Sequence, residues 1–489
     1  MRIDTLHLAN SKPEQVAISY HSEKITFSEM EREVQKFAGY FKTLGVCRGA
    51  KVALLCPNSP DFILSYWGIN RAGGTVVPVN LMFTPEEIGF VLHNSGAEII
   101  VVHPLIAKKF GPQALAGLGA RHVVVLNGET KGKIAASEPC LAKDGGEDDI
   151  AAILYTSGTT GKPKGAVLTH KNFISDVVSL VRSTVITRHD NFLCVLPMFH
   201  SFAWTVCVLL PLYCGATTVI LETFQPNETV NTIVDEDITF ILAVPPMYGI
   251  LLRKAKPGQL KNVYVAVSGG APLPKEIYYA FTKKFPINFI EGYGLTEAAP
   301  VVSINPVAGI KKPGSIGKPL PDIEVIIGDE QGKEVACGEV GEILVKGENV
   351  MQGYYKDEQA ASEAFVNGWL RTGDMGLMDE DGYIFIVDRK KDIIIVSGFN
   401  VYPREIEDLL YSHPQIEEAA VIGVPDETRG EVPKVFIVPK EGEEIDKKEV
   451  LAFLKPKLAQ YKLPREIEIR ESLPKNAAGK ILKKFLKQE

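Results

Sequence analysis

The sequence has few cysteines and little excess of charge. Its seven cysteines are scattered, and none forms a Cys-x-x-Cys pair or a Cys/His cluster with metal-ligand spacing. This excludes a disulfide framework and a zinc site, and we expect reduced, buried thiols. The net charge of -7 over 489 residues gives no general attraction to polyanions, so nucleic acid is not an expected partner. A phosphate-bearing ligand would need a local site.

The chain also lacks a recognisable targeting segment. Residues 1–15 are polar and partly acidic where a secretory signal would need a basic start followed by an apolar core. With 45% hydrophobic and 23% charged residues, the composition is that of an ordinary globular protein without low-complexity regions. We therefore expect a folded cytoplasmic protein.

Residues 191–221 contain no Asp, Glu, Lys or Arg and could be mistaken for a membrane span. Pro197, His200, Pro211 and Gly215 interrupt this stretch, and a lipid-exposed helix would have to find partners for the backbone groups that they free. The pattern therefore predicts no transmembrane segment, and instead a buried strand, a loop and a helix around an apolar pocket.

Short apolar runs alternate with amphipathic runs through the first three hundred residues. Residues 27–45 and 85–96 have helical periodicity, while 51–56 and 99–102 are apolar and strand-like. Such alternation predicts an α/β fold with helix-covered parallel sheets. The apolar run that ends in Gly269 and Gly270 is of particular interest, because open α/β sheets bind ligands at the carboxyl ends of their strands.

The pattern changes after residue 320 to short alternating strands and turns, which predict a smaller β-rich subdomain. Beyond residue 390 follows a compact α+β segment. A charged run separates two apolar strands at residues 388–391, and we place the boundary there. The prediction is a large N-terminal domain over 1–388, a hinge near 389–391 and a small mobile domain over 392–489.

The segment YTSGTTGKPKG at residues 155–165 directly follows a buried apolar run. Its glycines, hydroxyls and lysines can present amides, hydroxyls and positive charge to phosphates. It is not a Walker loop, because the required glycine would fall at Thr156 and the lysine is followed by Pro163. The candidate phosphate-binding residues are Thr156, Ser157, Gly158, Thr159, Thr160, Gly161, Lys162 and Lys164.

This loop resembles the signature of the adenylate-forming superfamily, which includes acyl-CoA synthetases, peptide-synthetase adenylation domains and luciferases. Five further segments resemble motifs of that family in the same order along nearly the whole chain. They are SGGAPL at 268–273, GYGLTE at 292–297, GWLRTGD at 368–374, VDRKKDIIIVSGFNVYPREIE at 387–407 and PKNAAGKI at 474–481. The resemblance implies formation of an acyl-adenylate from ATP and a carboxylic acid.

The resemblance also implies the residues of the reaction. Bringing a carboxylate to the α-phosphate places anions together, at about 4 kcal/mol per pair of unit charges 4 Å apart in a dielectric near 20. Lys480 is expected to neutralise this charge, Glu297 to help hold Mg²⁺, and Thr296 to contact phosphate. His200 is included among the catalytic residues by its place in the segment FHSFAW.

The nucleotide site follows from the same motifs. Tyr293 is expected to stack on adenine, Asp374 to accept the ribose hydroxyls and Arg389 to make a second ribose contact. The backbone around the adenine is assigned to Gly269, Gly270, Ala271, Pro272, Gly292 and Gly294. In this family the C-terminal domain rotates between the two half-reactions, so Lys391 would lie at the hinge and Gly398 would line the channel for coenzyme A.

The sequence also indicates the acid and the acceptor. Peptide-synthetase adenylation domains generally have an Asp one residue after a Phe, whereas here His200 follows Phe199, so an amino acid is not the expected substrate. Phe199 and Trp204 resemble the acyl-pocket segment of fatty acyl-CoA synthetases. We expect a medium- or long-chain fatty acid, with aryl and short-chain acids as alternatives. No carrier-protein domain follows the last motif, which favours coenzyme A as the acceptor.

Two other functions stay open at this point. A non-catalytic adenylate-binding protein could keep the fold, but the retention of Glu297, Lys480 and the loop lysines favours an enzyme. Oxidative chemistry of the luciferase kind shares the adenylation residues. The expected ligands are a carboxylic acid, Mg-ATP and coenzyme A. The basic C-terminal tail permits transient contact with a membrane, and the sequence is compatible with a homodimer.

Overall fold

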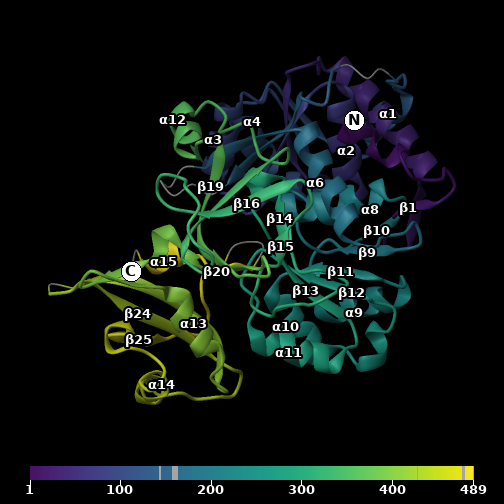
Figure 1. The fold of residues 1–489 in the computed structure, drawn as a ribbon. Helices are drawn as coiled ribbons and strands as arrows, with labels where there is room; N and C mark the ends of the chain where they lie inside the picture. The colour runs from purple at the N-terminus through teal and green to yellow at the C-terminus, as the bar shows by residue number, and fades with distance from the viewer. Residues whose placement is uncertain (142–144, 157–162, 427, 476–478, 488–489) are drawn as a thin grey trace.

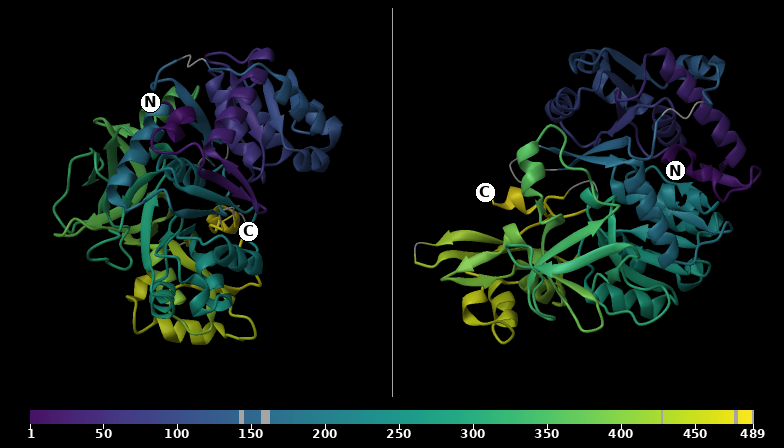
Figure 2. Two further views of the ribbon diagram at one scale, coloured as in Figure 1. Left: turned by 90° about the vertical axis from the view of Figure 1, so that its right-hand side faces the viewer. Right: turned by 45° about the horizontal axis from the view of Figure 1, so that its top comes forward.

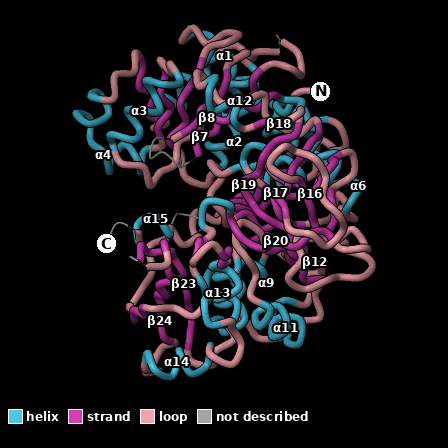
Figure 3. Tube along the Cα trace, turned by 60° about the vertical axis from the view of Figure 1, so that its left-hand side comes forward, coloured by secondary structure: helices cyan, strands magenta, loops and turns pink. Residues whose placement is uncertain are grey.

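The computed structural model describes residues 1–141, 145–156, 163–426, 428–475 and 479–487. The chain up to about residue 390 forms a large body, and the yellow-green to yellow elements that follow form a smaller one beside it (Figure 1). The second and third views separate the same two bodies (Figures 2 and 3). The α/β fold class predicted from the sequence is confirmed.

A six-stranded sheet forms the N-terminal part of the large body. Its strand order is β6-β5-β3-β4-β7-β8, and the neighbouring strands are parallel except β7 and β8, which form an antiparallel pair. The strands are β3 (Lys51–Leu55), β4 (Thr75–Pro78), β5 (Ile99–Val102), β6 (His122–Val125), β7 (Ile150–Thr156) and β8 (Lys164–Thr169). The helices are α1 (Phe27–Thr43), α2 (Pro60–Arg71), α3 (Pro85–Ser95), α4 (Pro104–Gly117) and α5 (Gly128–Ala136).

A nine-stranded sheet carries the centre of the large body, in the order β15-β14-β13-β12-β11-β9-β10-β1-β2. Its six central strands are parallel, and β2, β14 and β15 pair antiparallel at the edges. The strands are β1 (Val16–Tyr20), β2 (Glu23–Thr26), β9 (Asn191–Cys194), β10 (Thr217–Ile220), β11 (Phe240–Ala243), β12 (Val265–Ser268), β13 (Asn288–Gly294), β14 (Val301–Ile304) and β15 (Lys318–Pro319). The associated helices are α6 (His170–Ser183), α9 (Pro226–Asp235), α10 (Pro245–Lys254) and α11 (Lys275–Lys284).

Helix starts follow from local sequence signals. The side chains of Thr26 and Thr84 each accept a hydrogen bond from the backbone amide of the third helical residue. The glutamate at that position in turn accepts a hydrogen bond from the threonine backbone amide. Such capping boxes satisfy two amide donors that would otherwise lack partners. Helix α1 then buries Met30, Val34 and Phe37 on one stripe, as its helical spacing predicts.

The uncharged stretch 191–221 folds as β9, three short helical segments and β10. The segments are α7 (Ser201–Ala203), the π-helical turn η2 (Trp204–Leu209) and α8 (Leu210–Tyr213). This is the predicted strand, loop and helix. Within the described part of the chain, no helix has the length and apolar character needed to cross a membrane.

Two smaller sheets follow. The first has the order β16-β17-β19-β18 with β20 on β19, and the second has β22-β21-β24-β23 with β25 on β24. Their strands are β16 (Ile323–Gly328), β17 (Gly341–Gly347), β18 (Phe365–Val366), β19 (Trp369–Met378), β20 (Ile384–Arg389), β21 (Ile394–Val396), β22 (Phe399–Val401), β23 (Ile416–Asp426), β24 (Gly430–Pro439) and β25 (Glu466–Ile469). The helices are α12 (Glu358–Glu363), α13 (Pro403–Tyr411), α14 (Lys447–Leu454) and α15 (Lys483–Leu486).

The charged run at 389–391 lies between the two small sheets. Strand β20 ends at Arg389, a short 3-10 turn covers Lys390–Asp392, and β21 begins at Ile394. Two apolar cores contain only residues from Ile394 onward, so the C-terminal segment has interior packing of its own. The exact boundary, with domains over 1–388 and 392–489, stays a prediction.

Candidate active site

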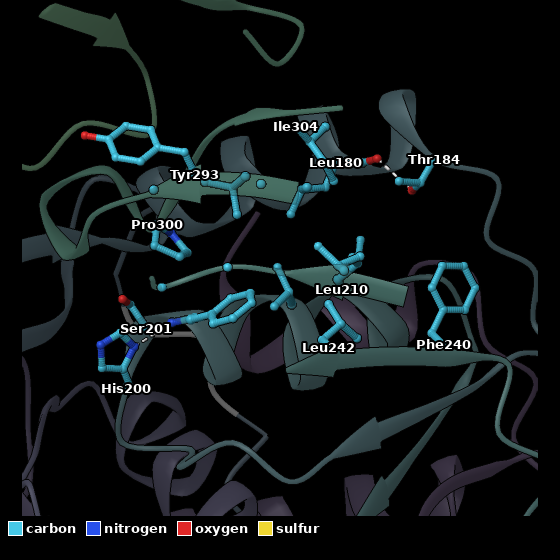
Figure 4. Close-up of a pocket in the computed structure, with 18 of the residues that line it drawn as sticks. Leu180, Thr184, His200, Ser201, Leu210, Phe240, Leu242, Tyr293, Pro300 and Ile304 are labelled. Carbon is cyan, nitrogen blue, oxygen red and sulfur yellow. Dashed lines mark hydrogen bonds between the residues drawn. The ribbon is translucent and has the colours of Figure 1, made fainter. Parts of the chain in front are cut away.

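A cavity opens at the carboxyl ends of β11, β12 and β13 and extends between the central sheet and α6 (Figure 4). The empty space within it, including open solvent at its mouth, is about 740 Å³. His200 and Ser201 lie at one end of the view, Phe240 and Thr184 at the other. The cavity therefore has a polar end and a long apolar part.

The polar end is built by two loops that follow strands. His200 caps α7, since its Nδ1 accepts the Phe202 amide at 3.2 Å. The hydroxyls of Ser201 and Thr296 are 3.4 Å apart, which joins this loop to the segment after β13. Desolvation of the imidazole by neighbouring groups, followed by the nearby charge of Lys480, lowers the pKa of His200. His200 is therefore neutral at pH 7 and can donate or accept a hydrogen bond.

Tyr293, Asp374 and Arg389 form one hydrogen-bonded group. The Tyr293 hydroxyl donates to Oδ2 of Asp374 at 2.6 Å, and Nε of Arg389 lies 3.0 Å from Oδ1. The register of β19 and β20 places Asp374 and Arg389 opposite each other. The buried carboxylate thus has a partner on each oxygen and, with about four acceptor positions, retains capacity for hydroxyls of a ligand.

Lys480 interacts electrostatically with Arg389 and Asp374, although it is about a hundred residues from them in sequence. Burial, followed by the charge of Arg389, lowers its pKa to about 8, and Asp374 acts in the opposite direction. The charge of Lys480 also lowers the pKa of His200, so it acts both on the polar end of the cavity and on the Asp374–Arg389 pair. A cation that acts on both groups suits a carboxylate in the cavity and a phosphate of a nucleotide.

The backbone before Lys480 depends on a glycine. Gly479 has φ +76°, where side-chain-bearing residues are strained, and a Cβ there would lie 3.7 Å from Val244 Cγ2. Gly479 therefore lies close to Val244, the residue that follows β11 in the large body.

Glu297 and Tyr354 form a second polar group. The Tyr354 hydroxyl donates to Oε1 of Glu297 at 2.8 Å, and Nζ of Lys164 lies over the Tyr354 ring at 5.4 Å from its centroid. One carboxylate beside the Thr296 hydroxyl suits Mg²⁺, which takes oxygen ligands and usually keeps water and substrate phosphates as its other partners. Among the described residues, no group of three or more His, Cys, Asp or Glu could form an all-protein metal site.

The predicted phosphate loop lies mainly outside the described residues, which holds for Ser157, Gly158, Thr159, Thr160, Gly161 and Lys162. The two ends of the loop are described. Thr156 closes β7, Lys164 opens β8, and their register pairs them across the hairpin. The Lys164 end therefore lies next to Tyr354.

The segment after β12 forms the wall next to the cavity. Gly269 and Gly270 line it, together with Gly292 and Gly294 of β13, while Ala271 and Pro272 continue the turn. A Cβ at Gly269 would lie 3.0 Å from Cζ of Phe202, closer than ordinary van der Waals contact. The wall can approach the Phe202 ring only because this position lacks a side chain.

That Phe199 and Trp204 line the acyl pocket stays a prediction. Neither is among the described residues that line the cavity. Trp204 is buried on the other side of its helix, stacked on Tyr66 at 4.0 Å between ring centroids. Phe202, Val206 and Leu210 of the same segment face the cavity instead, because residues four apart share one helical face.

Lys391 and Gly398 lie outside the cavity. Lys391 is in the turn after β20, where burial and the charge of Arg389 lower its pKa. Gly398 has φ +86° between β21 and β22, and a Cβ there would meet no heavy atom within 4 Å. The hinge and channel roles of these two residues stay predictions.

Three residues of this site were missed by sequence reasoning. Tyr354 is 57 positions from Glu297 and only folding brings them together. Phe202 was not predicted, whereas its aromatic neighbours Phe199 and Trp204 were. Phe202 and Trp204 are two residues apart and therefore point to different faces of the helix. Gly479 stood inside a recognised motif, and its place before Lys480 was the available signal.

Comparison with known proteins identifies the family. The model of the AMP-binding enzyme family matches residues 7–355, and that of the AMP-binding enzyme C-terminal domain matches residues 405–480. The chain therefore belongs to the AMP-binding enzyme family. Its class is that of the AMP-forming acid–thiol ligases.

Two curated relatives are similar over nearly their whole length. A long-chain-fatty-acid–CoA ligase of Bacillus subtilis is 35% identical, with 98% of this chain and 92% of the relative covered. A feruloyl-CoA synthase of an Amycolatopsis species is also 35% identical, with 97% of this chain and 96% of the relative covered. Overall identity thus does not separate alkyl from aryl acids.

Among solved structures, ATP-bound MatB from Rhodopseudomonas palustris matches with a TM-score of 0.94 at 32% identity, covering 100% of this chain and 99% of that one. The apo structure of the same protein covers the same shares at 31% identity but with a TM-score of only 0.82. The present chain as a whole therefore superposes better on the ATP-bound structure than on the apo structure.

Proposed function

We propose that this chain is an ATP-dependent fatty acid:CoA ligase. In the first half-reaction a carboxylate oxygen of the acid attacks the α-phosphorus of ATP, and pyrophosphate leaves with the electron pair of the broken P–O bond. In the second, the thiol of coenzyme A attacks the acyl carbon, loses its proton, and AMP leaves. Both steps conserve charge and atoms without an oxidant or reductant.

The residues at the polar end suit the first half-reaction. Lys480 would supply positive charge where carboxylate and phosphate meet, and Thr296 and Ser201 would offer hydroxyls there. Asp374 and Arg389 would orient the ribose, with Tyr293 beside the base. Glu297 would hold Mg²⁺, which when bound neutralises phosphate charge.

The choice of a fatty acid rests on the apolar part of the cavity. The two ionisable side chains among its described lining residues, His200 and Tyr293, belong to the polar end. At the far end the Thr184 hydroxyl donates a hydrogen bond to the Leu180 carbonyl at 2.8 Å, so its proton is not available to a ligand in the cavity. A second carboxylate or a phenolic hydroxyl would lose its hydrogen bonds with water there, whereas an alkyl chain loses none.

An aryl acid is the second candidate, because the feruloyl-CoA synthase is as similar in sequence as the fatty-acid ligase. A methoxylated phenol would have to place its hydroxyl among Leu210, Leu242 and Ile304. A benzoate without polar substituents meets no such obstacle. The two candidates therefore differ in the polarity that the substrate carries away from its carboxylate.

The test is coenzyme A-dependent AMP release with a panel of acids at equal concentration. The panel comprises acetate, hexanoate, decanoate, palmitate, benzoate, ferulate, a dicarboxylate and an amino acid. We expect the highest kcat/KM with an alkyl acid and little turnover of the dicarboxylate or the amino acid. A preference for benzoate or ferulate would contradict the fatty-acid assignment alone. Adenylation with none of the acids would favour a non-catalytic adenylate-binding protein.

A further inference from the structure

The apolar part of the cavity is a shaft with regular walls. On the sheet side, Val265 and Val267 of β12 point to the same face as Gly269, since alternate residues of a strand share a face. On the helix side, Phe202, Val206 and Leu210 follow one another at intervals of four residues. Both walls run from the polar end toward the amino ends of the strands.

The bottom of the shaft is a row of three side chains across neighbouring strands. Phe240 pairs with Phe192 on one side and with Val265 on the other. The rings of Phe192 and Phe240 are stacked with centroids 4.2 Å apart, and Tyr264 meets Phe240 edge-on at 4.8 Å. Figure 4 shows Phe240 at the end of the cavity farthest from His200. A linear substrate that follows the shaft must stop at this aromatic floor.

The depth follows from backbone geometry. From Gly269 to Val265 there are four strand steps of about 3.3 Å, or roughly 13 Å. The helix side gives no second measure, because Trp204–Leu209 form a π-helical turn, whose rise per residue differs from that of an α-helix.

We infer that the shaft limits the substrate to medium-chain acids and that Phe240 is the residue that sets the limit. With carbon–carbon bonds of about 1.5 Å, an extended chain advances about 1.3 Å per carbon, so the shaft holds about ten carbons. The inference rests on the proposed fatty-acid function and specifies the acids within it. Chains of about eight to twelve carbons fill the shaft, and longer chains would have to fold back or displace the floor.

The experiment measures kcat/KM for saturated acids of even length from four to eighteen carbons. In wild type we expect a rise of roughly three- to four-fold per added methylene, up to an optimum near decanoate. Beyond the optimum the value should fall at least about ten-fold by myristate, because the added carbons meet the floor. Palmitate as the best substrate, without a fall, would overturn the inference while the fatty-acid function stands.

Two variants test the role of Phe240 directly. Phe240→Leu removes the outer part of the ring and should move the optimum upward by at least two carbons. Val267→Phe places a ring halfway along the shaft and should move it down to about hexanoate. This second variant also keeps the inference testable if Phe240→Leu folds poorly.

Phe289→Leu is the matched control. Phe289 is a buried phenylalanine of the same sheet that packs in the core on the opposite face. Its replacement should lower stability to a similar degree and leave the optimum at the same chain length. If Phe240→Leu also leaves the optimum unchanged, Phe240 does not set the limit. If benzoate or ferulate outperforms every alkyl acid in wild type, the proposed function itself fails.

Discussion

Lys480 shows at the scale of a single residue how position determines chemistry. In water its ammonium would persist to about pH 10.4, but burial and the charge of Arg389 lower its pKa to about 8. The charged form therefore predominates below pH 8 and the neutral form above it. Since only the charged form can neutralise the meeting anions, adenylation should depend on pH in this range.

We predict that kcat/KM for acid-dependent adenylation falls as pH rises through about 8. In kcat the fall should lie at higher pH, because bound triphosphate favours the ammonium form of Lys480. Lys480→Arg provides the control, since a guanidinium stays charged above pH 12. The variant should be slower but lack the fall near pH 8. An identical fall in both proteins would assign it to another group.

At the scale of elements, the loop before Lys480 depends on the left-handed backbone of Gly479. An L-residue there costs about 1–2 kcal/mol, which the loop can avoid by moving. Because 1.36 kcal/mol corresponds to a factor of ten in rate, we predict that Gly479→Ala lowers adenylation by about ten-fold. The rate of pyrophosphate exchange into ATP measures this.

Gly442 allows a matched comparison. It also has a positive φ, +81°, in a turn between β24 and α14, and a Cβ there meets nothing within 4 Å. Gly442→Ala should thus carry the same kind of backbone strain while adenylation stays within about two-fold of wild type. Equal losses in both variants would show that the effect of Gly479→Ala is a general loss of stability.

The sequence predicted most of the elements but not all of their relations. Alternating apolar and amphipathic runs predicted the parallel sheets, because buried strands and one-sided helices have different periods. The antiparallel turn of β8 onto β7 was not predicted, since a strand's direction depends on the loop before it. In the uncharged stretch 191–221 every helical face is apolar, so periodicity could not separate the face of Trp204 from that of Phe202.

The candidate site was predictable where a motif keeps its residues close in sequence. Thr296 and Glu297 stand within four residues of Tyr293; Tyr293 and Thr296 line the cavity, and Glu297 accepts a hydrogen bond from Tyr354. The Tyr354–Glu297 hydrogen bond was not predictable in the same way, because an isolated tyrosine carries no local signal of a partner 57 positions away. The residues at the floor of the shaft and its depth could be identified only from the register of the strands.

At the scale of the whole molecule, an ion pair between exposed side chains joins the two bodies. Helix α13 lies beside the α10–α11 end of the large body (Figures 1 and 3). Arg253 of α10 pairs with Glu417 of β23 at 3.3 Å. Both side chains are partly exposed, so the pair contributes less than about 1 kcal/mol and is screened by salt. A contact of this strength can bias the arrangement without locking it.

We predict that Glu417→Lys lowers the adenylation rate by about two- to five-fold at low salt and less at high salt. Transfer of a supplied acyl-adenylate to coenzyme A should change little, because the variant disfavours only the arrangement that brings Lys480 to the site. The double variant Arg253→Glu, Glu417→Lys restores a pair of opposite charges and should recover the rate. Lack of recovery would mean that the two side chains do not act together.

The central claim is that this site forms an acyl-adenylate and that Lys480 acts in that half-reaction. The most direct measurement compares wild type and Lys480→Ala in decanoate-dependent exchange of pyrophosphate into ATP and in transfer of supplied decanoyl-adenylate to coenzyme A. We expect exchange to fall by at least about a hundred-fold in the variant, while transfer stays within a few-fold of wild type. Equal rates of exchange in both proteins, or an equal loss of both half-reactions in the variant, would contradict the account.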